Sequence, residues 1–430
     1  KKPNWPENYD FRQRGPVKMK EALGQSLNIP AVKTLYLAGT NEVAETAKSM
    51  GMIESFYKKL DPTELNLAMA IGGKDIIPLE LVSAFGVFST DGLRYLPNYI
   101  LKIENKRGEV IFEPEPQPVK ALDAEICRQT NSILSDNNLR APMFGSRSWL
   151  YLNSWTAAKT GTATNDKGKV IDVWTIGYTT NLVTGVWVGN NKNESMHGRV
   201  SGATAAAPIW WHFMKEATKN DPHQRFTSPK KVRTGKTVLD GYLPKTTVKI
   251  DKISGKLATD ITPKDLIEEK SFFEPHSILW WVQKDDPRGE YPRNPFDDSR
   301  CKNWEGGVKS WAEKTGGEFS LPVEKDDIHT TENKPKIEIV SKSITPKEDE
   351  EGNPILNREI NFSIKIDAKK GVKKIEVFLG EKKLSSKETN KLNHSFTYKI
   401  KDIGEKESYK LKIKVTDKVE NIGEITFEIK

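Results

Sequence analysis

The 430-residue chain is poor in metal-binding and disulfide-forming side chains, with two cysteines and six histidines. Two cysteines exclude a disulfide scaffold and a four-thiolate zinc site, but Cys127 and Cys301 could form one bridge or stay free. The histidines show no H-E-x-x-H or similar spacing, so we expect no metal site and no other cofactor. No run of about 18 apolar residues occurs, which excludes a transmembrane helix within this sequence.

The chain also lacks a concentrated charge of one sign. Lysine and arginine number 67 against 59 aspartates and glutamates, a net charge of +8. The excess is spread over mixed Lys/Glu stretches, so we expect a solvated surface and no nucleic-acid partner. The sequence opens on Lys1 with no apolar signal segment. We therefore expect an internal or C-terminal piece of a longer protein, with any targeting segment upstream.

Composition divides the chain into three parts. All eleven tryptophans lie between Trp5 and Trp311, and the sequence after a polar stretch at 323–336 is rich in Lys, Ile, Val and Glu. Length and this shift predict a first domain over 1–225, an extension or linker with small β elements over 226–333, and a last domain over 334–430.

The first part mixes helical and strand patterns. Apolar spacing predicts helices over 16–37, 43–50, 78–89 and 203–217. Strands are expected over 155–164, 172–180 and 182–189, and short strands over 99–103 and 110–112. A tight turn at Thr180-Asn181 would join the second and third of the long strands. Helices on either side of consecutive antiparallel strands indicate an α+β fold.

The last part shows clean alternation of apolar and polar residues. The apolar faces occur over 360–366, 375–379, 396–400, 409–415 and 425–429. Several short alternating strands in about 95 residues predict an all-β immunoglobulin-like sandwich. It contains no cysteine, so it is not pinned by a disulfide.

Two short motifs could carry chemistry. Ser26 and Asn28 form an S-x-N pattern in the middle of the first predicted helix, and residues 159–161 form a K-T-G pattern on a predicted strand. K-T-G recurs at 314–316, where it follows a helical stretch and ends in two glycines. We interpret the second copy as a helix stop and expect only the first to be functional.

These residue types suit serine acyl transfer, for which the motifs S-x-x-K, S-D-N and K-T-G occur together. On a strand edge, Lys159 and Thr160 would attract the terminal carboxylate of a peptide that pairs with the backbone. Gly161 permits close approach, and the N–H of Thr162 would help to stabilise an oxyanion. The S-x-N pair on the opposite wall would relay a proton and hold a substrate amide.

Residues 1 to about 217 resemble the transpeptidase domain of class A high-molecular-mass penicillin-binding proteins. The resembling stretches follow one order: 14–17, 21–32, 67–73, 77–81, 158–162, 174–179, 183–189 and 207–210. The segment 250–263 is similar to the one that follows this domain in the family. The resemblance implies a fold like that of penicillin-binding proteins and serine β-lactamases, an antiparallel sheet flanked by helices.

The resemblance also implies a function and roles for the motif residues. The expected activity is a D,D-transpeptidase that cross-links peptidoglycan through an acyl-enzyme on a D-Ala-D-Ala stem peptide, without a cofactor. It assigns catalytic roles to Ser26, Asn28 and Lys159, and substrate binding to Thr160, Gly161 and Thr162. Implied partners are stem peptides, the lipid-linked precursor, β-lactams and other cell-wall synthesis proteins.

The parent protein is expected to carry a glycosyltransferase domain and an upstream anchor that holds it at the outer face of the cytoplasmic membrane. Two alternatives stay open, one a different enzyme and the other a non-catalytic protein. One is a β-lactamase or a plain D,D-carboxypeptidase, against which the long tail argues. The other is a homologue that lacks the nucleophile and binds or scaffolds the cell wall.

One element of the family pattern is missing. The nucleophile of the family lies in an S-x-x-K motif upstream of S-x-N, and none of the 25 residues before Ser26 is a serine. S-x-x-K patterns begin at Ser55, Ser228 and Ser299, all after Ser26, and Ser55 to Lys58 is expected in a loop. We therefore expect the acylating serine and its lysine to lie outside this chain, and the chain alone to be inactive.

Overall fold

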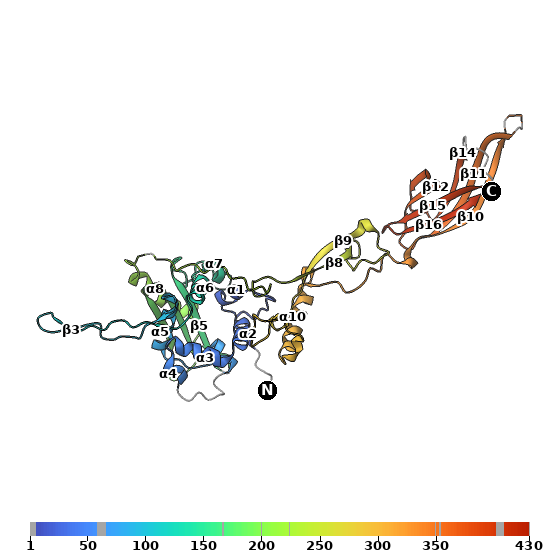
Figure 1. Ribbon diagram of the computed structural model, residues 1–430. Coiled ribbons are helices and arrows are strands. Elements are labelled where there is room, and N and C mark those ends of the chain that lie inside the picture. The colour runs from blue at the N-terminus through green and yellow to red at the C-terminus, as the bar shows by residue number, and fades with distance from the viewer. Residues whose placement is uncertain are drawn as a thin grey trace. The chain divides into compact units, whose positions relative to one another are not determined.

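The computed structural model describes residues 6–57, 66–165, 167–198, 200–222, 224–348, 350–351, 354–400 and 408–429. The chain packs as two compact units (Figure 1). Unit 1 comprises Lys1–Pro244 and Pro275–Lys314, and unit 2 comprises Lys245–Glu274 and Thr315–Lys430. The domain boundaries expected at 225 and 333 stay a prediction, because a compact unit of the fold need not coincide with a domain.

Unit 1 is built around a three-stranded antiparallel sheet of order β5-β6-β7. Its strands are β5 (Ala157–Thr164), β6 (Val170–Tyr178) and β7 (Val183–Gly189). In register, Gly161 lies opposite Trp174, and Trp174 lies opposite Trp187. The three long strands predicted from the sequence are confirmed.

Two helices pack on β7 from different faces. Helix α5 (Pro78–Ser89) has the bounds predicted from the sequence, and helix α8 (Ala207–Ala217) follows a single π-helical turn, η2 (Gly202–Ala206). A Cβ on Gly185 would lie 2.4 Å from Cγ2 of Val82 in α5. Val186, the next residue, packs instead with the buried cluster around Trp210 of α8. Successive strand residues point to opposite faces, so the sheet is covered on both.

The N-terminal region corrects one prediction. Instead of a continuous helix over 16–37, α1 (Met19–Gly24) and α2 (Asn28–Ala38) are separate helices. Ser26 lies between them with a φ of 56°. The N–H of Leu27 donates to the carbonyl of Ala22 at 2.9 Å, and the N–H of Ser26 to that of Leu23 at 3.1 Å. These bonds form a Schellman motif, with Ser26 at the left-handed position that usually holds glycine.

The remaining elements of unit 1 are short. The helices that follow α2 are α3 (Thr40–Ser49), α4 (Ile53–Tyr57), η1 (Leu67–Ile71), α6 (Ala124–Leu134) and α7 (Asn137–Phe144). The chain 275–314 adds α9 (Ile278–Trp281) and most of α10 (Cys301–Thr315), and α10 was not predicted over its length. Cys127 and Cys301 are both buried and free, which settles the question of a bridge.

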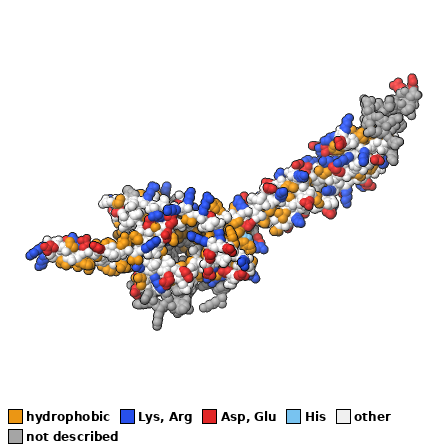
Figure 2. Space-filling view, in the orientation of Figure 1, with side chains coloured by type: hydrophobic (Ala, Val, Ile, Leu, Met, Phe, Trp, Pro, Cys, Tyr) orange, Lys and Arg blue, Asp and Glu red, His pale blue; other side chains and the backbone are white. Residues whose placement is uncertain are grey.

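A narrow arm extends from unit 1. It carries β1 (Leu93–Arg94) paired with β4 (Val119–Lys120), and β2 (Ile103–Glu104) paired with β3 (Val110–Phe112). Apolar side chains gather along one side of the arm (Figure 2). Tyr99, between β1 and β2, is 82% exposed. Over the part of the chain that the structure describes, every helix is too short or too polar to span a bilayer.

Unit 2 contains a small antiparallel hairpin and a larger two-sheet tail. The hairpin pairs β8 (Lys245–Asp251) with β9 (Ile267–Phe273). The two-sheet tail has one sheet of order β10-β11-β14 and another of order β13-β12-β15-β16. Its strands are β10 (Lys336–Glu348), β11 (Pro354–Asp367), β12 (Val372–Leu379), β13 (Lys382–Glu388), β14 (Asn393–Ile400), β15 (Tyr409–Asp417) and β16 (Ile422–Ile429).

A single apolar core joins the two sheets of the tail. Ile360, Phe362, Ile364 and Ile366 of β11 pack in one cluster with alternate residues of β12 and β15. The strands expected at the five alternating stretches are therefore found, and the apolar side chains that the structure describes on them pack into or against this core. Strands β10 and β13 were not predicted; β13 reads Lys-Lys-Leu-Ser-Ser-Lys-Glu and lies at a sheet edge.

Candidate active site

The first K-T-G motif lies on strand β5, and its lysine reaches the S-x-N turn. Nζ of Lys159 donates to Oγ of Ser26 at 2.6 Å and to the carbonyl of Thr160 at 2.7 Å. Ser26 and Lys159 are 133 positions apart in sequence, so only the tertiary fold brings them together. The Schellman turn between α1 and α2 holds the Ser26 hydroxyl in this place.

The environment of Lys159 weakens its hold on a proton. The side chain as a whole is half-buried, but its ammonium is enclosed by protein atoms. This burial lowers the pKa of Lys159 from its usual value of 10.5 to about 8. A lysine of that pKa exchanges a proton with a neighbouring hydroxyl more readily than an exposed lysine does.

The substrate-binding residues predicted on β5 are fixed by the turn η2. Oγ1 of Thr162 accepts the N–H of Gly202 at 3.2 Å. Oγ1 of Thr175, on β6, donates to the carbonyl of Gly202 at 3.0 Å. A Cβ on Gly202 would lie 2.4 Å from the carbonyl oxygen of Trp174 and 2.7 Å from that of Gly161. Only glycine allows η2 to pack directly against both strands.

Gly202 packs against the K-T-G strand and was not predicted from the sequence. The signal for it was a lone glycine ahead of a small-residue helix, and that pattern has no single meaning in sequence. Thr160, Gly161 and Thr162 lie on β5, which is at the edge of the sheet among the described strands. An edge strand offers unpaired backbone groups to an extended peptide.

Asn28 is placed differently from Ser26. It is the first residue of α2, and its Nδ2 donates to the backbone carbonyl of Glu7 at 2.8 Å. The next amide, of Ile29, donates to Oδ1 of Asn8 at 3.2 Å. The side-chain amide of Asn28 therefore connects the N-terminal segment to α2. The hydrogen bond between Ser26 and Lys159 does not involve it.

The other matches to the sequence motifs have ordinary surroundings. Ser55 lies in helix α4 and not in the loop that was expected, because the chain turns helical again two residues after Gly51. Its Oγ donates to Oε2 of Glu80 at 2.5 Å, so the hydroxyl proton is already used in a hydrogen bond. Lys58, its motif partner, lies outside the described residues. At the second K-T-G copy, α10 ends at Thr315 and Gly316 has a φ of 63°, so the helix-stop interpretation is confirmed.

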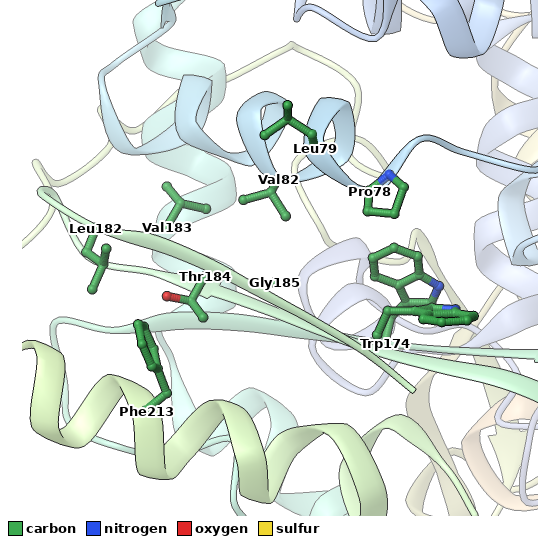
Figure 3. A pocket seen from close by; sticks show the side chains of 10 residues that line it. Pro78, Leu79, Val82, Trp174, Leu182, Val183, Thr184, Gly185 and Phe213 are labelled. Carbon is green, nitrogen blue, oxygen red and sulfur yellow. The ribbon is translucent and has the colours of Figure 1, made fainter. Parts of the chain in front are cut away.

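An apolar groove of about 360 Å³ lies between α5, β7 and α8 (Figure 3). Its walls are mostly aliphatic and aromatic, with Pro78, Leu79 and Val82 on one side and Leu182 and Phe213 on the other. The residues that line it include none of the six predicted site residues. Its composition suits packing or apolar contact, whereas the chemistry-bearing groups gather at β5.

Comparison with known proteins agrees with the family resemblance seen in the sequence. Residues 1–210 match the family model described as the penicillin binding protein transpeptidase domain. Penicillin-binding protein 1A of Aquifex aeolicus is 32% identical over 224 residues, which cover 52% of this chain and 29% of that protein. Penicillin-binding protein 2D of Bacillus subtilis is 30% identical over 233 residues, covering 53% and 32%.

A similar solved structure is that of the PonA1 protein from Mycobacterium tuberculosis in complex with penicillin V. It has 24% sequence identity and a TM-score of 0.45, and the match covers 53% of this chain and 63% of that chain. The matched region is about a third of the length of the two curated relatives.

Proposed function

Because residues 1–210 belong to the penicillin-binding protein transpeptidase family, we propose that this chain carries part of a D,D-transpeptidase that cross-links peptidoglycan by serine acyl transfer. The observation that carries the proposal is the 2.6 Å hydrogen bond between Nζ of Lys159 and Oγ of Ser26. It joins the two motifs on which the sequence argument rested. No step in this scheme uses a metal or an organic cofactor.

In the proposed mechanism, Ser26 and Lys159 form a proton relay beside the acylating serine. The lowered pKa of Lys159 suits this role, because its ammonium gives up and regains a proton near neutral pH. The hydroxyl of Ser26 then transfers the proton to the leaving amine when the acyl-enzyme forms. When charged, Lys159 also attracts the terminal carboxylate of the donor peptide.

The other motif residues bind and orient the substrate. The donor peptide lies along the edge strand β5, where Thr160 binds its carboxylate and Gly161 admits its backbone. The N–H of Thr162 supports the oxyanion of the tetrahedral intermediate. Asn28 holds a substrate amide once its side chain turns from the carbonyl of Glu7.

The acylating serine and its lysine are supplied by sequence outside these 430 residues. Sequence order supports this, because the S-x-x-K motif precedes S-x-N in the family and no serine precedes Ser26 here. The parent then carries a glycosyltransferase domain and an anchor at the outer face of the cytoplasmic membrane. Its partners are stem peptides, the lipid-linked precursor, β-lactams and other cell-wall synthesis proteins.

The two-sheet tail is an immunoglobulin-like sandwich that serves for binding or spacing. Two features support this: a three-stranded and a four-stranded antiparallel sheet, and one apolar core shared between them. Many extracellular modules share this architecture without a disulfide or an active site.

The test is acylation by a labelled penicillin. We expect the 430-residue chain to remain unlabelled and the complete parent to be labelled at a serine upstream of Ser26. Ser55→Ala in the parent should label as well as the wild type, since its hydroxyl is bonded to Glu80. Labelling of the isolated chain at any residue would contradict the proposal.

The same preparation separates a β-lactamase and a wall-binding scaffold from the proposed enzyme. A β-lactamase would release hydrolysed penicillin with many turnovers, whereas a transpeptidase holds a stable adduct. A wall-binding scaffold that has lost its nucleophile would give no adduct even with its full upstream sequence.

A further inference from the structure

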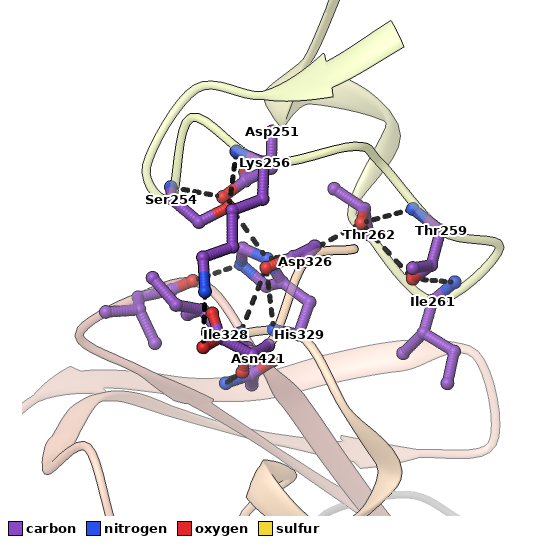
Figure 4. Close-up of polar contacts among 12 residues, drawn as sticks. Asp251, Ser254, Lys256, Thr259, Ile261, Thr262, Asp326, Ile328, His329 and Asn421 are labelled. Atoms are coloured by element: carbon purple, nitrogen blue, oxygen red, sulfur yellow. Dashed lines mark hydrogen bonds and ion pairs between the residues drawn. The ribbon is translucent and has the colours of Figure 1, made fainter. Parts of the chain in front are cut away.

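Three buried side chains converge in unit 2. Asp251 ends strand β8, whereas Asp326 and His329 lie in the segment that precedes the two-sheet tail (Figure 4). Their exposed fractions are 0%, 5% and 1%. One ligand atom from each lies within 4.8 Å of the others. Nδ1 of His329 is 2.7 Å from Oδ2 of Asp326 and 3.7 Å from Oδ2 of Asp251.

The surroundings orient each of these groups. Nε2 of His329 is 2.8 Å from the carbonyl oxygen of Val419, which can only accept, so Nε2 carries a hydrogen. Nδ1 is therefore the nitrogen that faces the two carboxylates. Oγ1 of Thr262 donates to Oδ2 of Asp326 at 2.8 Å, and the N–H of Ser254 donates to Oδ2 of Asp251 at 2.6 Å. Such outer contacts are how metal ligands are held in proteins.

The charges of this cluster call for a cation. Two buried carboxylates beside one imidazole are an arrangement that proteins stabilise by pairing or by a metal ion. Oδ1 of Asp251 is buried and has no hydrogen-bond partner among the described residues. The nearby Lys256 is bonded to Glu324 and Asp327 instead.

We infer that Asp251, Asp326 and His329 form a structural site for one divalent metal ion of the zinc class. An ion of charge +2 would neutralise both carboxylates, and bound through both oxygens of Asp251 it would also give the buried Oδ1 a partner. Imidazole nitrogen and carboxylate oxygen bind Zn²⁺ at about 2.0–2.2 Å, so tetrahedral ligands lie about 3.3 Å apart. The separations of 2.7 and 3.7 Å lie on either side of that value.

The site would join two parts of unit 2. Asp251 belongs to the β8–β9 hairpin, and His329 contacts Val419 in the turn between β15 and β16. Nδ2 of Asn421, in the same turn, donates to the carbonyl of Ile328 at 3.2 Å. A metal ion here would hold the hairpin and the two-sheet tail together. Local ligand spacing in the sequence does not reveal this cluster, because Asp251 comes from a hairpin far from Asp326 and His329 in the chain.

The first test is metal binding by the full 430-residue chain, stripped with EDTA and dialysed against Zn²⁺ or Co²⁺. We expect one equivalent of metal, and visible absorption of Co²⁺ typical of inner-sphere nitrogen and oxygen ligands. Asp251→Asn and His329→Gln should each lower the affinity at least about tenfold. The controls Asp327→Asn and His276→Gln should bind like the wild type.

The second test reads the stability of unit 2 separately and does not depend on the variants folding. All tryptophans belong to unit 1, so tryptophan fluorescence follows unit 1 while circular dichroism follows both units. We expect Zn²⁺ to raise the transition of the tryptophan-free unit by about 4 °C, reversibly with EDTA, and to leave the fluorescence transition in place.

Three results would overturn the inference. They are binding no stronger than background in the wild type, equal binding in Asp251→Asn, or an equal shift of both transitions. In each case a proton shared by His329 and Asp326 is the cation of this cluster.

Discussion

Ser26 occupies a backbone position that glycine would fill at lower cost. Its φ of 56° is left-handed, and for a residue with a Cβ this conformation costs on the order of 1 kcal/mol. The compensating contact is the hydrogen bond from Lys159 to the hydroxyl. This agrees with the proton-relay role proposed for Ser26, because glycine would satisfy the backbone alone.

Two substitutions of Ser26 separate backbone strain from chemistry. Ser26→Gly and Ser26→Ala both remove the hydroxyl, but only glycine adopts a φ of 56° freely. We expect Ser26→Gly to be more stable than Ser26→Ala by about 1 kcal/mol. Urea unfolding followed by tryptophan fluorescence measures this difference. An alanine variant as stable as the glycine variant would mean that the turn is unstrained.

The lowered pKa of Lys159 predicts a pH dependence of stability. The folded chain holds this proton below about pH 8 and the unfolded chain below about pH 10.5, so the unfolded state binds more protons between these values. The free energy of unfolding should therefore gain about 2 kcal/mol from this group between about pH 7.5 and 9.5. Lys159→Met should lack this gain. Parallel pH profiles of the two proteins would show that the lysine titrates normally.

Lys159 and Lys314 occupy the same tripeptide in different surroundings, which makes them a matched pair. In the complete parent, Lys159→Ala should lose a charged hydrogen bond worth about 1.5–3 kcal/mol. The rate of penicillin acylation should fall roughly 10- to 100-fold. Lys314→Ala, at the end of α10, should leave the rate unchanged. Similar losses at both lysines would contradict the assignment of the K-T-G motif.

At the scale of elements, strands with strict alternation were predictable and interrupted ones were not. β11 and β15 bury every second residue over their apolar stretches, so the period of two was visible in sequence. In β10 the register shifts between Ile339 and Ser341, which breaks the alternation. The helix break at Ser26 was missed because apolar spacing continues across it, while the left-handed turn carries no glycine to mark it.

The contact of η2 with the sheet gives a prediction at this scale. Gly202→Ala would place a Cβ 2.4 Å from the carbonyl oxygen of Trp174, a backbone atom that cannot rotate away. We expect a loss of about 1–3 kcal/mol of stability and a displaced K-T-G strand. In the parent, acylation should fall as well. Urea unfolding and penicillin labelling check the two effects.

Gly306→Ala is the control for that substitution. Gly306 lies inside α10 with nothing within 4 Å of its Cβ position, so alanine should be neutral or stabilising there. Equal effects of the two substitutions on stability would show that η2 shifts to make room for the added Cβ.

At the scale of the whole molecule, sequence could name the motifs but not their partners. The order of motifs predicted the Ser26 and Lys159 pair, because a known family has that order. Gly202 and the Asp251 cluster depend on packing between distant segments, which no local pattern encodes. The same limit applies to 275–314, which reads as part of a linker but packs within unit 1.

The two units should unfold as separate transitions. Each has at least one buried apolar cluster of its own, and that of unit 2 lies in the two-sheet tail. Tryptophan fluorescence reports the unfolding of unit 1 alone, whereas circular dichroism reports both units. The urea midpoint seen by fluorescence should therefore differ from the midpoint of the circular dichroism change that belongs to unit 2. Coincident midpoints by both probes would mean that the chain unfolds as one cooperative body.

Deletion of 334–430 extends this argument to function. The Ser26–Lys159 pair and its supporting turn lie in unit 1, and their hydrogen bonds are made within it. In the complete parent, the truncated protein should therefore keep its penicillin acylation rate within about twofold, because a separately folded module adds no group to the chemistry. The fluorescence midpoint of unit 1 should stay the same and serves as the check that the domain is intact. A large loss of acylation with an unchanged midpoint would show that the tail helps to form or gate the active site, because unit 1 would still be folded as before.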